Sequence, residues 1–311
     1  MYLDHFGLRE PPFRITPHTD FFFPGARRGA TLEALLYAIV HEEGIVKVSG
    51  EVGSGKTMLC RVLMERLPAS VDTLYIANPT LSPAALLHTI AEELGCPPET
   101  RFDARIRPIQ DALIARHAAG RRVVALVDEA HAMPKASLEQ IRLLSNLETG
   151  KHKLLQIVLV GQPELDELLG QTDMRQLRDR ITHHFRLDPM KPRETAEYLG
   201  FRMRAAGYRG PDVFSRPAVA RIARASGGLT RRINILADKS LLAAYADGQH
   251  RVGRREVDAA IRDAAYATPR DWRPWVAVAA IGGVLAAAAW WWSVAPVGPL
   301  TPPAAAAAPD R

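Results

Sequence analysis

Short apolar runs rich in β-branched residues alternate with longer amphipathic stretches through the first two thirds of the chain. The apolar runs predict strands and the amphipathic stretches predict helices, because strands buried on both faces read as nearly continuous apolar segments. The expected strands are 45–49, 73–77, 123–127, 155–160 and 183–187. The expected helices between them are 57–67, 83–94, 106–118, 135–148 and 163–181. This alternation predicts an α/β fold with a parallel sheet covered by helices.

After residue 188 the strand signals stop and helical periodicity continues alone. Glycine and proline separate the helices expected here, which are 192–206, 215–225, 230–247 and 254–265. We therefore expect an α/β domain over 26–188 and a small all-helical lid domain over 189–267. Residues 1–25 are assigned to a separate N-terminal segment, and residues 268–274 form a short polar linker.

An uncharged stretch of 21 residues covers positions 275–295. As a helix it would be roughly 31 Å long, about the thickness of a hydrocarbon core. Tryptophans lie near both of its ends, and Arg270 and Arg273 precede it, whereas no basic residue follows until Arg311. The positive-inside rule then predicts a single-pass transmembrane helix in the inner membrane, with the N-terminal body in the cytoplasm. Residues 296–311 would form a short periplasmic tail.

The formal net charge is +6 over 311 residues and is carried mostly by arginine. A basic excess suits nucleic acid or an anionic membrane surface, although the solvated helix faces of an arginine-rich protein give the same balance. The two cysteines, Cys60 and Cys96, show no metal-ligand spacing and are too few for a disulfide framework. This usage fits a reducing compartment. The N-terminus lacks a basic stretch followed by an apolar one, so we expect no signal peptide.

Residues 50–57, GEVGSGKT, match the phosphate-binding pattern G-x-x-x-x-G-K-[ST] directly after a strand and before a helix. Backbone N–H groups of such a loop converge on phosphate oxygens, and the helix N-terminus adds positive potential. The residues expected to bind ATP here are Gly50, Glu51, Val52, Gly53, Ser54, Gly55, Lys56 and Thr57. Lys56 would reach the β- and γ-phosphates, and the Thr57 hydroxyl would ligate Mg²⁺.

The third expected strand ends in two acids, Asp128 and Glu129. Ligands of open α/β sheets bind at the carboxyl ends of the strands. We expect Asp128 to hold Mg²⁺ through water and Glu129 to polarise the attacking water as a general base. His131 completes the string DEAH and is expected to be a local loop or cap residue. Helicases with a DEAH box need a second nucleotide-binding-type domain, which the helical remainder of this chain does not match.

Three further polar positions are candidates for sensing or stabilising the γ-phosphate. Gln162 follows the fourth strand and either orients the attacking water or is a turn residue before Pro163. Arg180 is expected to act as an arginine finger on a neighbouring subunit's site, with Arg178 as the second choice and a solvated helix face as the alternative. Arg231 follows two glycines in the helical domain and would fold back over the nucleotide.

These motifs, in this order, resemble an AAA+ ATPase, and the resemblance narrows to the ExeA/GspA family. The segments that carry it, within residues 1–265, are MYLDHFGLREPPFRITPHTDFFF, EGIVKVSGEVGSGKTMLCR, LVDEAH, LVGQPEL, QLRDRI and SGGLTRRIN. The family includes general secretion pathway protein A and the MSHA pilus-biogenesis protein MshM. The resemblance implies a cytoplasmic ATPase that forms rings or higher oligomers and helps place or assemble a secretin or a type IV pilus. It also implies that Phe13, Ile15 and Pro17 lie near the adenine.

The resemblance is incomplete at the C-terminus. Secretion members of the family carry a large peptidoglycan-binding periplasmic domain, whereas only residues 296–311 follow the expected span. We therefore expect a pilus-type member, or a secretion ATPase with a separate inner-membrane or periplasmic partner. A DNA-handling AAA+ ATPase is the alternative, which the expected span and the absence of a helix-turn-helix disfavour. A nucleotide-gated scaffold with little turnover is a third interpretation, disfavoured by Glu129 and Arg180.

Overall fold

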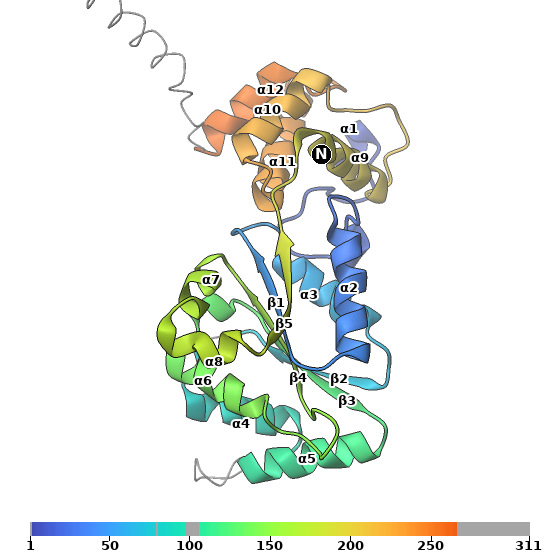
Figure 1. Ribbon diagram of the computed structural model, residues 1–311. Helices are drawn as coiled ribbons and strands as arrows, with labels where there is room; N and C mark the ends of the chain where they lie inside the picture. Colours follow the sequence, from blue (N-terminus) through green and yellow to red (C-terminus); the bar gives the residue numbers. More distant parts are fainter. Residues whose placement is uncertain (1, 79, 98–105, 266–311) are drawn as a thin grey trace, which may run out of the picture. The chain divides into compact units, whose positions relative to one another are not determined.

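The computed structural model describes residues 2–78, 80–97 and 106–265. They contain a five-stranded parallel sheet with the strand order β2-β3-β4-β1-β5 (Figure 1). The strands are β1 (Ile45–Gly50), β2 (Val71–Ile76), β3 (Arg122–Val127), β4 (Gln156–Gly161) and β5 (Ile181–Leu187). The parallel α/β sheet expected from the alternating pattern is therefore confirmed.

Helices cover both faces of the sheet. Successive residues of a strand point to opposite sides, and apolar residues on both sides of these strands need a covering layer. On one face, Val46 and Val48 of β1 belong to a hydrophobic cluster with α2 (Arg28–His41) and α3 (Lys56–Arg66). On the other face, Ile45 belongs to a second cluster. The helices of that second cluster are α4 (Pro83–Glu93), α5 (Ile106–Ala118), α6 (Lys135–Leu144), α7 (Glu164–Leu169) and α8 (Arg175–Arg178).

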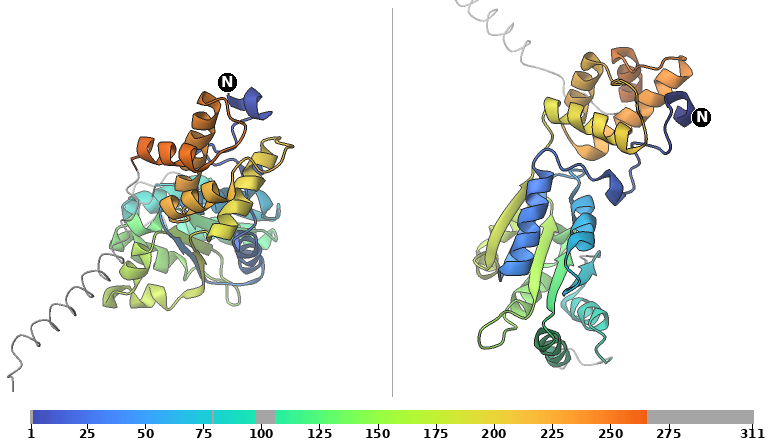
Figure 2. Two further views of the ribbon diagram at one scale, coloured as in Figure 1. Left: turned by 90° about the horizontal axis from the view of Figure 1, so that it is seen from above. Right: turned by 90° about the vertical axis from the view of Figure 1, so that its right-hand side faces the viewer.

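A third hydrophobic cluster lies in the helices that follow the sheet. These are α9 (Pro192–Ala205), α10 (Arg216–Ser226), α11 (Thr230–Ala246) and α12 (Arg254–Asp263), drawn in yellow to orange beyond the carboxyl ends of β1 and β5 (Figures 1 and 2). The short helix α1 (Tyr2–Phe6) and a 3₁₀ turn (Thr19–Phe21) from the N-terminus pack into the same cluster. The N-terminal segment therefore packs with helices α9–α12, which are called the helical unit below.

A buried arginine, Arg202 of α9, fastens the N-terminal segment to this cluster. Its Nε donates to the carbonyl oxygen of Pro12 at 2.6 Å, and its guanidinium lies 4.7 Å from the ring centroid of Phe21. A second guanidinium nitrogen donates to the Tyr198 hydroxyl at 2.9 Å, and that hydroxyl donates to Asn234 at 2.7 Å. These hydrogen bonds to Arg202 and Tyr198 compensate for burying the guanidinium charge.

The helices differ from the prediction chiefly in two places, and α6 also ends at Leu144 and not at the expected residue 148. The single helix expected over 163–181 is wrong: α7 ends before Gly170, a 3₁₀ turn (Thr172–Met174) and α8 follow, and Ile181 already belongs to β5. Gly170 and the polar residues after it interrupt the apolar period, which explains the break. Helix α2 was not predicted, although its buried residues Leu32, Leu35 and Ile39 follow helical spacing.

The predicted transmembrane helix 275–295, its linker and its tail lie outside the described residues. Within the residues that the structure describes, no helix is both long enough and apolar enough to cross a membrane.

Candidate nucleotide-binding site

Three neighbouring strands end at one edge of the sheet and bring most of the expected site residues together. In the order β3-β4-β1 all three strands are parallel, so their carboxyl ends coincide. The loop 50–57 follows β1, Asp128 and Glu129 follow β3, and Gln162 follows β4. The strand order therefore places the expected phosphate loop beside the expected acids, with Gln162 between them.

The loop 50–57 turns sharply into α3 through two left-handed glycines, Gly53 (φ 76°) and Gly55 (φ 103°). Side chains with a Cβ rarely adopt this conformation. Lys56, 5% exposed, begins the helix, and its Nζ donates to the carbonyl oxygens of Gly50 at 2.8 Å and Glu51 at 3.1 Å. Burial lowers the pKa of Lys56, and the nearby carboxylates oppose that change. The lysine is thus a buried cation held on the carbonyls of its own loop.

The carboxylate of Asp128 accepts hydrogen bonds on both oxygens. Its Oδ2 accepts from the Thr57 hydroxyl and from the Tyr75 hydroxyl, each at 3.1 Å, and its Oδ1 accepts from the Glu129 N–H at 2.9 Å. Burial, together with the Asp128 charge, raises the pKa of Tyr75, so this hydroxyl stays a donor. A hydroxyl beside a carboxylate is a hard oxygen pair of the kind that Mg²⁺ prefers.

An unsatisfied polar atom in the loop also fits a nucleotide. Among the described residues, the buried Ser54 Oγ has no hydrogen-bond partner. Buried hydroxyls in native proteins nearly always have one. Together with the Thr57–Asp128 pair, this orphaned hydroxyl makes the loop suited to a ligand with many oxygens and a divalent cation, such as Mg²⁺-ATP.

Glu129 has a left-handed backbone conformation, with φ 52° and ψ 33°. Its Oε2 accepts a hydrogen bond from Nε2 of Gln162 at 3.2 Å and lies 3.5 Å from Nδ1 of His131. The structure therefore brings the expected base and the residue at the end of β4 into direct contact. Residues in rare backbone conformations occur frequently at functional sites.

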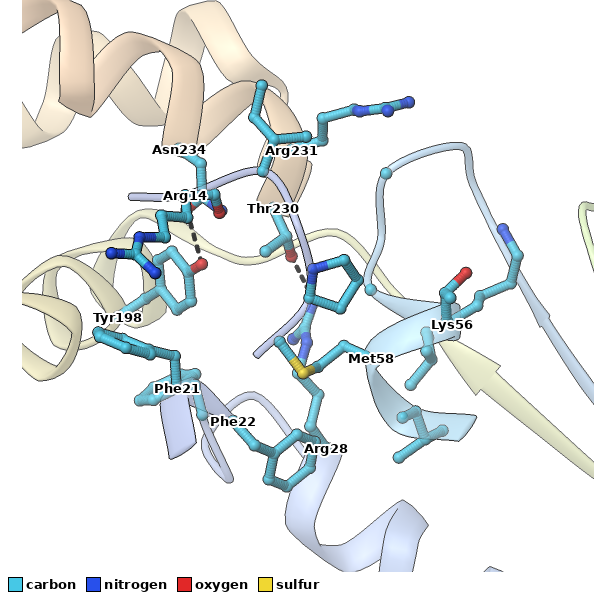
Figure 3. A pocket seen from close by; sticks show the side chains of 18 of the residues that line it. Arg14, Phe21, Phe22, Arg28, Lys56, Met58, Tyr198, Thr230, Arg231 and Asn234 are labelled. Atoms are coloured by element: carbon cyan, nitrogen blue, oxygen red, sulfur yellow. Dashed lines mark hydrogen bonds between the residues drawn. The ribbon is translucent and has the colours of Figure 1, made fainter. Parts of the chain in front are cut away.

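A cavity of about 380 Å³ extends from the phosphate loop to the helical unit and the N-terminal segment (Figure 3). Ile15 and Pro17, which the resemblance implies to lie near the adenine, line it. Glu129 and four aromatic residues, Phe21, Phe22, Phe23 and Tyr198, also line it. Phe13 is buried in the helical cluster and is not among the residues that line the cavity. A largely apolar pocket beside a phosphate loop suits a nucleotide base.

The start of α11 lies directly on the phosphate loop. The Arg231 N–H donates to the carbonyl oxygen of Gly53 at 3.0 Å, and the Thr230 hydroxyl donates to that of Ser54 at 3.2 Å. A Cβ added to Gly53 would lie 2.7 Å from the Arg231 Cβ, which only glycine avoids. The expected sensor residue Arg231 is thus placed against the loop by its backbone, and its side chain is exposed.

Two further residues of the site were not expected from the sequence. Arg28, 6% exposed, donates to the Ser54 carbonyl at 3.1 Å and to the Thr230 hydroxyl at 3.4 Å, and burial lowers its pKa. It therefore joins α2, the phosphate loop and α11. The second is Tyr75, whose contact with Asp128 depends on the pairing of β2 with β3. No local motif marks either residue.

Arg180 lies at the opposite edge of the sheet from the phosphate loop. It precedes β5, and its carbonyl oxygen accepts from the Ile45 N–H at 3.2 Å at the start of β1. The length of β1, about 20 Å for six residues, separates it from the loop. Arg178 is exposed, and its Nε lies 3.9 Å from the carboxylate of Asp179. Neither arginine therefore belongs to the site of its own chain.

Comparison with known proteins agrees with this geometry. Residues 40–169 match the family described as AAA domain. General secretion pathway protein A of Aeromonas hydrophila is 40% identical over 290 residues, which are 92% of this chain and 52% of that protein. The chain thus spans about half the length of this relative.

Solved structures share the fold at low identity. Cdc6p of Pyrobaculum aerophilum is 17% identical, with a TM-score of 0.62 over 81% of this chain and 70% of that one. The Aeropyrum pernix ORC1 protein in complex with DNA is 18% identical, with a TM-score of 0.61 over 82% and 69%. Fold and motifs together define a P-loop protein with an AAA domain. Its expected resemblance to the ExeA/GspA family, and to general secretion pathway protein A within it, is confirmed.

Replacing Tyr75 by phenylalanine removes one of the donors that orient Asp128. If Asp128 holds Mg²⁺ as expected, the Mg²⁺ concentration for half-maximal ATP binding should rise about tenfold, because groups behind a metal ligand typically contribute that much to metal affinity. Titration of Mg²⁺ against ATP binding measures this. Tyr37→Phe, at a tyrosine that is 57% exposed, is the matched control. Identical Mg²⁺ dependence of the two variants would contradict the placement of the ion.

Proposed function

We propose that this protein is a membrane-anchored AAA+ ATPase that couples ATP hydrolysis to the assembly or placement of a cell-envelope machine. The machine is a type II secretion secretin or an MSHA-like type IV pilus. The contact that carries the proposal of hydrolysis joins Gln162 Nε2 and Glu129 Oε2 at 3.2 Å. The Glu129 carboxylate in this contact belongs to a residue that lines the cavity, as Lys56 does.

The residues divide the chemistry between binding and activation of water. Lys56 leaves the carbonyls of its loop and neutralises the β- and γ-phosphates, while the loop amides and Ser54 donate to phosphate oxygens. Thr57 directly and Asp128 through water would hold Mg²⁺, which would offset charge on the phosphates. Glu129 accepts the proton of the attacking water, and the amide of Gln162 orients the same water.

Completion of the site requires a second copy of the chain. Among the described residues that line the cavity, Lys56, Arg28 and Arg231 belong to the phosphate loop or contact it, and the last of these is exposed. Arg14 and Arg202 line the cavity from the N-terminal segment and α9. Arg180 is too far away to act in its own chain and is positioned on another edge, as an arginine supplied to a neighbour would be. The proposal therefore includes a ring or higher oligomer in which Arg180 acts in trans.

The location and partner of the protein are proposed from the sequence and the relative. Residues 275–295 have the length and the aromatic flanks of a membrane span, with basic residues on the N-terminal side. The relative from Aeromonas hydrophila is called a general secretion pathway protein. We therefore infer a single-pass inner-membrane protein with a cytoplasmic ATPase body and an inner-membrane or periplasmic partner from a secretion or pilus-assembly system.

Two substitutions separate binding from hydrolysis. Lys56→Ala should weaken ATP binding by about tenfold to a hundredfold, because the phosphates lose a charged donor. Glu129→Gln should bind ATP normally and lower kcat by about a hundredfold or more, because the base acts on water. Equilibrium ATP binding and phosphate release measure the two effects. Wild-type turnover by Glu129→Gln would exclude it as the base.

Mixing two inactive variants tests the arginine finger. Arg180→Ala retains Lys56 and Glu129, whereas Glu129→Gln retains Arg180. In a mixed oligomer the second variant can supply its arginine to the intact site of the first, so partial ATPase activity should return. Co-assembly is checked by pull-down of differently tagged copies. Co-assembled but inactive mixtures would show that Arg180 does not act across a subunit boundary.

Topology is tested with reporter fusions on either side of the proposed span. A fusion after Asp271 should report the cytoplasm and a fusion after Arg311 the periplasm, because basic residues flank only the N-terminal side. Paired reporters that are active on opposite sides of the membrane give the measurement. Cytoplasmic signals from both fusions would rule out the span.

A further inference from the structure

His131 lies between the two residues proposed to act on the attacking water. Its Nδ1 accepts the backbone N–H of Gln162 at 3.5 Å and lies 3.5 Å from Oε2 of Glu129. The same carboxylate oxygen accepts the side-chain amide of Gln162 at 3.2 Å. The three residues thus form a closed group in which His131 contacts the backbone of one partner and the carboxylate of the other.

The turn that contains His131 packs closely against the end of β4. The 3₁₀ turn Ala130–Ala132 follows Glu129, and a Cβ added to Gly161 would lie 3.2 Å from the backbone nitrogen of His131 and 2.9 Å from the side chain of Leu165. The His131 side chain is 17% exposed. The ring therefore has little room to leave its place between the two loops.

Glu129 depends on this turn for its orientation. Its left-handed backbone is a conformation that persists only when surrounding contacts enforce it. Two backbone contacts do so: its N–H donates to Asp128 at 2.9 Å, and its carbonyl oxygen accepts from the Ala132 N–H at 2.9 Å. Both leave the side chain free to rotate, so the carboxylate itself is placed by the Gln162 side-chain amide, whose backbone N–H His131 accepts.

We propose that His131 is a positioning residue: it accepts the Gln162 backbone N–H and so holds the residue whose side-chain amide donates to the Glu129 carboxylate, so that both side chains meet one water. The inference rests on the proposed ATPase function. Acceptance of the Gln162 N–H requires a neutral imidazole with its proton on Nε2. The role goes beyond the local loop residue expected from the sequence, because the ring joins the ends of two different strands.

Two substitutions distinguish positioning from packing. Asparagine at position 131 keeps an acceptor near the place of Nδ1, whereas leucine fills similar space without one. In the full-length oligomer, His131→Leu should lower kcat on the order of tenfold to a hundredfold with the ATP dissociation constant unchanged within about twofold, because small displacements at a reacting centre cost this much. His131→Asn should recover most of the loss. Equal losses in the two variants would overturn the proposal.

A double-mutant cycle with Gln162→Ala gives a second, independent measure. If His131 acts by placing Gln162 against Glu129, the further loss from His131→Leu should be much smaller in the Gln162→Ala background than in the wild type. Fully additive losses would overturn the proposal. His131→Ala replaces the leucine variant in both experiments if the latter does not give a folded protein by its thermal melt.

The same assay separates this inference from the proposed function. An active Glu129→Gln variant would overturn the ATPase mechanism and, with it, the role of His131. An inactive Glu129→Gln variant beside a fully active His131→Leu variant would overturn the positioning role alone and leave the proposed function in place.

Discussion

The parallel pairing of β3, β4 and β1 is the constraint on which the candidate site depends. Hydrogen bonds along these strands put the loop after β1, the acids after β3 and Gln162 after β4 at one edge of the sheet. Strands β1 and β4 are buried along their whole length on both faces, so a register slip would disrupt close packing on both faces and is disfavoured. The relative positions of Lys56, Asp128 and Glu129 therefore follow from the core.

A second set of contacts ties the phosphate loop to parts of the chain that are distant in sequence. The carbonyl oxygens of Gly53 and Ser54 accept from Arg231, Thr230 and Arg28, which come from α11 and α2. A nucleotide that reordered this loop would move the carbonyl oxygens that accept hydrogen bonds from Thr230 and Arg231 at the start of α11. These hydrogen bonds connect the backbone of the phosphate loop to the start of α11. A change in the loop backbone on phosphate binding would therefore reach α11 directly, in addition to any effect through side chains.

The strands and most helices could be predicted from the sequence because burial imposes a regular spacing of apolar residues, which is visible within each segment. This spacing predicted α9 to within one residue at each end, whereas the helix expected over 163–181 proved to be two short helices and a turn. Lys56, Asp128 and Glu129 were selected from contiguous motifs, and their roles remain predictions. Arg28, Tyr75 and the contacts of His131 were not foreseen, because they depend on which strands and helices become neighbours.

The chain connects the sheet and the helical unit at two places. Phe23 packs in the helical cluster and Leu32 in a cluster of the sheet, so the chain crosses once between them; it crosses back between Leu187 and Met190. Two covalent connections restrict the relative motion of the sheet and the helices more than a single linker would. Phe23, Leu187 and Met190 all line the cavity. A molecule bound there therefore contacts both connections between the sheet and the helices at once.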